Sequence, residues 1–233
     1  MRSAKATEVW EALSTVCDPE LDEPITDLEF VEEVVVAGSG DVTVQFRLPT
    51  AWCSPNFAWL MATGIVTEVG KLGWVKEVRP ILRDHIFGNK INEGLTLGNS
   101  FEEVFGNEVS GSIEEVRKKF VIKAFQRRQE LVIKDLLNYG LEVFELLAMT
   151  LIDLSDFNFN NENANKNRLR YIEARGKFTV ENTAAFIDEN GEKIHPKNFQ
   201  SRMEKLRSTR LNMEFTGSVC RSLLKVRDKS ETS

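Results

Sequence analysis

One cysteine stands where a predicted strand gives way to a predicted helix, within the segment Pro49-Thr50-Ala51-Trp52-Cys53-Ser54-Pro55. Backbone N–H groups converge at the start of a helix, and they favour the thiolate form of a nearby cysteine. A thiol held there suits transient handling of a metal or of sulfur. The alternative is that Cys53 packs beneath Trp52 as a small apolar side chain. This segment is the clearest chemical signal in the chain.

Two carboxylates precede the cysteine segment, in Asp18-Pro19-Glu20. If Asp18 and Glu20 lie near the thiol, they would orient a metal or a partner. The alternative is that Asp-Pro only ends a helix and forms a turn. Thr50 has two interpretations as well: hydrogen bonds to amides of the loop, or capping of the helix that starts near Pro55. Asp84-His85 is interpreted as an ordinary strand end rather than as a metal or acid–base pair.

The remaining metal-binding residue types are sparse. The three cysteines, Cys17, Cys53 and Cys220, are far apart in the sequence without a C-x-x-C pair, and the chain has two histidines. This pattern argues against a disulfide framework and against a self-contained zinc or iron–sulfur site. We expect Cys17 and Cys220 to be structural, and any metal at Cys53 to share ligands with another chain. A small enzyme with Cys53 as nucleophile would lack a convincing base.

Composition and charge indicate a globular protein and argue against nucleic acid as its partner. Of 233 residues, 42% are hydrophobic and 28% charged, as in an ordinary globular protein. Residues 1–111 carry 8 basic and 18 acidic residues, whereas residues 161–233 carry 15 and 10. The acidic front argues against nucleic acid as a partner, and the basic tail is either a solvated face or a surface for an acidic protein. Without a long apolar run or a secretory signal, we expect a cytoplasmic protein that does not contact membranes.

The elements that would position the thiol follow from hydrophobic periodicity. Spacing of three and four predicts a helix over residues 5–16, and period-two alternation predicts a hairpin of two strands over residues 28–48. A second helix follows the cysteine segment and ends at Gly73. A third strand covers residues 74–82, with Pro80 indicating either an edge position or the end of the strand. The order α-β-β-α-β predicts an α+β domain over residues 1–87, with a small mixed sheet and helices on one face.

The rest of the chain is predicted to be a linker and a mainly helical extension. Glycine-rich residues 88–111 indicate a linker, with one helical turn at Ser100–Glu103 where the spacing fits a capping box. Residues 112–233 are the extension, which would bind a client or dimerise. Within it we predict a long helical segment over residues 113–154 divided at Gly140, and an exposed asparagine-rich loop over residues 157–167. A weak hairpin at residues 186–194 and two short helices over residues 196–206 and 218–226 complete it.

The order of elements, together with Asp18-Pro19-Glu20, Thr26-Asp27-Leu28 and Pro49-Thr50…Cys53…Pro55, resembles the SufT-like and PaaD-like metal–sulfur (iron–sulfur) cluster assembly family. The resemblance covers roughly residues 5–85. In that family the cysteine usually stands directly before the proline, whereas Ser54 stands there in this chain.

The resemblance implies a non-enzymatic maturation factor that assists assembly of an iron–sulfur cluster or iron centre in a client, such as a multicomponent oxygenase. It implies that Cys53 contacts the metal and that Asp18, Glu20 and Thr50 surround the metal site or bind the partner. Iron or a transient iron–sulfur cluster would be the cargo. The partner would be a client metalloprotein or a cluster scaffold, with a homodimer as a further arrangement. The alternative function is a protein–protein adaptor without thiol or metal chemistry.

Overall fold

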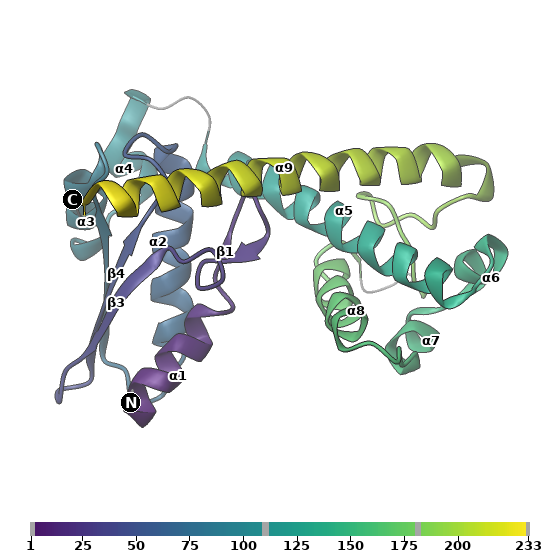
Figure 1. The fold of residues 1–233 in the computed structure, drawn as a ribbon, viewed down its shortest axis with the longest axis horizontal. Coiled ribbons are helices and arrows are strands. Elements are labelled where there is room, and N and C mark those ends of the chain that lie inside the picture. Colours follow the sequence, from purple (N-terminus) through teal and green to yellow (C-terminus); the bar gives the residue numbers. More distant parts are fainter. Residues whose placement is uncertain (1–2, 109–111, 180–182, 232–233) are drawn as a thin grey trace. The chain divides into compact units, whose positions relative to one another are not determined.

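The computed structural model describes residues 3–108, 112–179 and 183–231, and the chain forms two compact units (Figure 1). The first unit comprises Met1–Lys118 and Phe215–Ser233, and the second comprises Lys119–Glu214. These boundaries differ from the predicted ones because the first core extends beyond residue 87. Ile91, Phe101 and Leu224 are all buried in it.

A three-stranded mixed sheet forms the centre of the first unit. Strand β4 (Asp41–Arg47) lies between β3 (Val31–Val36), to which it is antiparallel, and β5 (Glu77–Arg83), to which it is parallel. The predicted α+β class is therefore confirmed, and Pro80 lies on an edge strand as expected. A second ribbon of two short strands, β1 (Cys17–Asp18) and β2 (Glu23–Pro24), was not predicted.

An irregularity in β3 explains a break in the sequence pattern. The pairing register with β4 shifts between Val31 and Glu33, which leaves Glu32 as an extra residue in a β-bulge. Without the bulge, the alternation would turn Glu32 toward the core. Instead Glu32 lies outward and forms an ion pair with Arg47 at 3.0 Å between Oε1 and Nε.

Two helices pack against this sheet. Helix α1 (Ala4–Leu13) ends earlier than predicted, and the hydroxyls of Ser14 and Thr15 donate to main-chain carbonyls of its last turn. Helix α2 (Pro55–Gly70) connects β4 to β5 and begins at Pro55 as expected. Its buried positions recur at helical spacing, namely Ala58, Trp59, Met61, Ala62, Ile65 and Val69.

The described part of the predicted linker is folded onto the first unit. It contains α3 (Gly88–Thr96), α4 (Phe101–Phe105) and a 3-10 turn (Gly106–Glu108), while residues 109–111 lie outside the described residues. Phe101 and Phe105 pack edge-on against Trp59, with ring centroids 5.8 and 6.5 Å away. A Cβ at Gly94 would lie 2.3 Å from Val104 Cγ2, so this glycine serves close helix packing rather than flexibility. The capping box at Ser100 is confirmed.

The second unit is built from helices. After α5 (Ile113–Tyr139), Gly140 adopts a φ of 109° and ends the helix as predicted. Helices α6 (Val143–Ala148), α7 (Leu151–Asp156) and α8 (Glu162–Arg175) follow. The predicted asparagine-rich loop is wrong from residue 162 onward, because Asn161 caps α8 by accepting from the Ala164 N–H. The two predicted C-terminal helices are a single helix, α9 (Phe199–Glu231).

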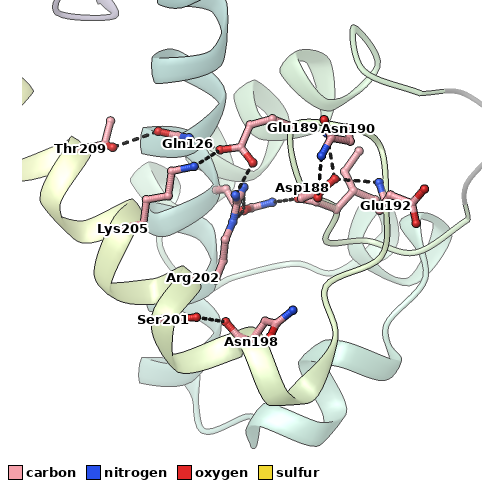
Figure 2. A network of polar contacts seen from close by, with 12 residues as sticks. Gln126, Asp188, Glu189, Asn190, Glu192, Asn198, Ser201, Arg202, Lys205 and Thr209 are labelled. Atoms are coloured by element: carbon pink, nitrogen blue, oxygen red, sulfur yellow. Dashed lines mark hydrogen bonds and ion pairs between the residues drawn. The ribbon is translucent and has the colours of Figure 1, made fainter.

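A polar network joins helices α5 and α9 to the turn at residues 188–192 within the second unit (Figure 2). Gln129 is fully buried, and its Nε2 donates to the Tyr171 hydroxyl and the Ile187 carbonyl at 3.0 and 2.7 Å. The Gln129 Oε1 accepts from Arg202 at 3.1 and 2.9 Å, and Arg202 in turn pairs with Glu189. The buried side chains of Gln129 and Tyr171 thus both meet hydrogen-bond partners, as buried polar groups of a stable core require. This network holds α5, α8 and α9 to the turn at residues 188–192, where Ile187 bridges Lys193.

Candidate functional site

The cysteine loop holds its thiol against a hydroxyl. The Thr50 Oγ1 lies 3.1 Å from the Cys53 Sγ, and Cys53 is half-buried at the edge of the first core. Trp52 is 74% exposed, so the thiol is not packed beneath an inward-facing indole. The N-cap of α2 is Ser54, which makes no side-chain cap bond. Because the N-cap residue is Ser54, the interpretation of Thr50 as the cap of this helix is wrong. The Thr50 side chain contacts the Cys53 sulfur instead.

His85 fixes the backbone of the same loop. Its Nδ1 accepts from the Phe87 N–H at 3.2 Å, so its Nε2 carries the proton and donates to the Cys53 carbonyl at 2.8 Å. Burial lowers the pKa of His85, although the bond to the Cys53 carbonyl opposes this shift. The Ile86 N–H also donates to the Ala51 carbonyl at 2.8 Å. His85 is thus a positioning residue for the cysteine loop, not the ordinary strand end that the sequence suggested.

The Asp18 carboxyl group stabilises a turn and has a raised pKa. Its Oδ1 accepts from the N–H groups of Glu20 and Leu21 at 2.8 and 2.9 Å. Burial raises the pKa of Asp18 to about 6, although these two hydrogen bonds lower it. Asp18 is 7% exposed, whereas Glu20 is only partly buried. A carboxyl that changes charge near neutral pH is typical of functional sites.

Cys220 joins these residues from the other end of the sequence, and sequence reasoning missed it. Burial raises the pKa of the Cys220 thiol to about 11, and the charges of Asp18, Cys53 and Glu20 raise it further. Asp18, Cys53 and Glu20 therefore lie near enough to Cys220 to influence its pKa. The sequence contained no signal for this grouping, because Cys220 follows the cysteine loop by more than a hundred residues.

A second residue that sequence reasoning missed is Asn56, which follows the helix-starting Pro55. Asn56 is 7% exposed, and its Oδ1 has no hydrogen-bond partner among the described residues. Leaving a buried acceptor unpaired costs about 1–3 kcal/mol. The signal in the sequence was a polar residue directly beside the cysteine loop, at the start of an otherwise apolar helical stripe.

The next question is whether the side chains around Cys53 could bind a metal ion by themselves. Within the described ranges, no three or more His, Cys, Asp or Glu side chains are grouped so that they could hold a metal ion. Structural metal sites in proteins usually need four ligands. Cys53 therefore does not belong to such a group among these residues.

Comparison with protein families matches the first unit. Residues 6–79 match the family described as iron-sulfur cluster assembly protein. The match covers about a third of the chain. The matched residues include Asp18, Glu20, Thr50 and Cys53, whereas His85, Cys220 and the C-terminal extension lie outside the match.

The family match confirms the resemblance found in the sequence and supports a role in iron–sulfur cluster assembly. No curated protein matches the chain. Among the helices of the described residues, none has the length and apolar character that crossing a membrane demands.

Proposed function

We propose that this protein is a non-enzymatic cytoplasmic factor that assists assembly of an iron–sulfur cluster or iron centre in a client metalloprotein, with Cys53 as the working thiol. The observation that carries the proposal is the Cys53 sulfur, held 3.1 Å from the Thr50 hydroxyl at the start of α2 within the matched residues. A hydroxyl in that position can donate to a thiolate, which is the form that binds metals.

In this proposal the chain supplies one thiolate and the partner supplies the remaining ligands. A single ligand binds cargo weakly, which suits transfer rather than storage. His85 keeps the loop in place through the Cys53 carbonyl, and Asp18 provides a carboxyl that titrates near neutral pH. The partner would be a client metalloprotein, such as a multicomponent oxygenase, or a cluster scaffold.

The test is complementation of a strain that lacks the gene. Iron–sulfur enzyme activities in cell extracts are measured with the wild-type chain, with Cys53→Ser and with Cys17→Ser as a matched control. Cys17 is also a half-buried cysteine of the first unit. We expect Cys53→Ser to lose the activity that the wild type restores, while Cys17→Ser retains it. Full activity with Cys53→Ser, at equal protein levels, contradicts the proposal.

The second candidate is an adaptor that uses the same fold without thiol chemistry. It is favoured by large apolar side chains exposed on the second unit, where Phe144 and Ile152 are each 72% exposed. An adaptor would tolerate Cys53→Ala but would lose partner capture with Phe144→Ser and Ile152→Ser. Both variants can be compared in one pulldown that is quantified by mass spectrometry.

A further inference from the structure

The C-terminal part of α9 turns one face toward the first unit. Gly217, Cys220, Arg221, Leu224 and Arg227 recur at intervals of three and four residues, and all are buried or partly buried. The neighbouring positions 218, 219, 222, 223, 225 and 226 are exposed. Such spacing places the first set on a single side of a helix.

One end of this face is bound beside the Asp18 turn. The Arg221 Nη1 donates to the Glu23 Oε2 at 2.7 Å, and Glu23 begins the strand paired with Cys17–Asp18. Gly217 is buried, and a Cβ there would lie 3.6 Å from Leu21 Cδ2. The helix therefore packs closely against residues 21–23.

The other end is bound to both flanks of the cysteine loop. Arg227 donates from Nη1 to the Leu48 carbonyl at 2.8 Å and from Nη2 to the Asp84 carbonyl at 2.7 Å. It also pairs with the Asp84 carboxylate at 3.5 Å. Leu48 directly precedes the loop of residues 49–55, and Asp84 directly precedes His85, which holds that loop.

The middle of the face lies over the core that the loop borders. Leu224 is 3% exposed and belongs to the same hydrophobic cluster against which both Cys53 and Cys220 pack. Helix α9 is therefore anchored at residues 21–23, at the core, and at residues 48 and 84. All three attachments come from a segment outside the matched family domain.

We propose that residues 215–231 of α9 act as a strap that closes over the cysteine loop and controls access to the Cys53 thiol. Cargo or a partner would reach the thiol when the strap detaches. The strap bears on the proposed function, because it would gate the same thiol, but its existence can be tested without any cluster.

Arg227 makes the polar contacts at the cysteine-loop end of the strap. The side chain of Arg227 is 18% exposed, so its two bonds to carbonyls are only partly screened by water. Charge-assisted hydrogen bonds of this kind are among the stronger polar contacts in proteins. Replacing Arg227 by methionine keeps an unbranched stem but removes every donor.

The experiment measures alkylation of Cys53 by iodoacetamide in the intact chain at neutral pH, with each cysteine quantified by peptide mass spectrometry. When opening is rapid, the alkylation rate follows the population of the open form. We expect Arg227→Met to raise the Cys53 rate by about tenfold, which corresponds to about 1.4 kcal/mol. Arg221→Met should raise it several-fold.

Lys225→Met is the matched control, because Lys225 is exposed on the same turns of α9 and the substitution removes the same charge. It should change the rate by less than about twofold. Cys17 reports general loosening of the first unit. The strap is disproved if Arg227→Met leaves the Cys53 rate within about twofold of wild type, or if Cys17 alkylation rises by the same factor.

The outcome separates the two proposals. A faster Cys53 rate in Arg227→Met, combined with full cellular activity of Cys53→Ser, would support the strap and contradict the maturation function. An unchanged Cys53 rate in Arg227→Met, combined with loss of cellular activity in Cys53→Ser, would contradict the strap and support the maturation function.

Discussion

Replacing Asp18 by asparagine is expected to stabilise the first unit at neutral pH. Asp18 is 7% exposed, and its carboxyl group accepts from the N–H groups of Glu20 and Leu21. Burial raises its pKa to about 6 despite these bonds. Asparagine keeps an oxygen that accepts the same hydrogen bonds, but it carries no charge to remove from water.

The magnitude follows from the difference between folded and unfolded pKa values. The pKa of Asp18 is about 6 in the folded chain against a reference of 3.8, which corresponds to roughly 3 kcal/mol. Because the folded state binds this proton more tightly, the ionised carboxylate destabilises the fold above pH 6. That destabilisation disappears as the pH falls below 3.8. Asp18→Asn should therefore raise the free energy of unfolding by about 2–3 kcal/mol at pH 8 and by less than about 1 kcal/mol at pH 4.

Tryptophan fluorescence during urea unfolding is a suitable assay. All four tryptophans, Trp10, Trp52, Trp59 and Trp74, belong to the first unit, so the signal reports that unit alone. The free energy of unfolding is extrapolated to water for wild type and variant at both pH values. Other titrating groups are common to both chains, so their effects cancel in the difference.

Asp27→Asn is the control, because Asp27 is exposed and loses the same charge. It should change the free energy of unfolding by less than about 0.5 kcal/mol at either pH. Equal stabilisation by Asp18→Asn at pH 4 and pH 8, or destabilisation at pH 8, would refute the reasoning. A variant that is more stable yet inactive in cells would show that the carboxylate is kept for function.

Three further predictions concern single side chains. Thr50→Val should slow iodoacetamide alkylation of Cys53 by about tenfold, since the donor to the thiolate is lost, whereas Thr50→Ser should retain the wild-type rate. Burial lowers the pKa of His85 from 6.5, so the neutral ring stabilises the fold above that pH, and this contribution is lost on acidification. An NMR titration should show His85 protonating below pH 6.5, and His85→Gln should weaken the pH dependence of stability. Burial alone would raise the pKa of Glu189, but hydrogen bonds from Arg202 and Lys205 to the Glu189 carboxylate lower this pKa to about 2. Glu189→Gln should therefore destabilise the second unit by about 2–3 kcal/mol at pH 7, and hydrogen exchange should show the difference shrinking between pH 4.5 and pH 2.

Features set by local chemistry were predictable from the sequence. Strict alternation identified β4, whose Val42, Val44 and Phe46 are fully buried. Pro80 marked an edge strand, and Gly140 marked a helix end where φ is 109°. In each case nearby residues decide the conformation. Alternating side chains define β4, the missing N–H of proline restricts Pro80 to an edge strand, and the missing Cβ of glycine allows the positive φ of Gly140.

Features set by distant contacts were not predictable. The glycines of residues 88–111 resembled a linker, yet Gly94 is required by contact with Val104, and Phe101 is buried against Trp59. Sequence alone shows the glycine but not the side chain that approaches it. The same holds for Cys220, which contributes to the site only because α9 continues onto the first unit.

The position of Cys53 also has a physical explanation in this chain. The Thr50 carbonyl accepts from the Cys53 N–H at 3.5 Å, and this turn brings the Thr50 hydroxyl within 3.1 Å of the sulfur. A cysteine directly before Pro55 would instead occupy the N-cap of α2, where Ser54 now lies. Cys53 thus occupies a turn position beside a hydroxyl rather than the helix-cap position. Exchanging Cys53 and Ser54 would keep a thiol in the loop but take it away from the Thr50 hydroxyl, so we expect the exchanged chain to restore less iron–sulfur enzyme activity than the wild type in the complementation assay.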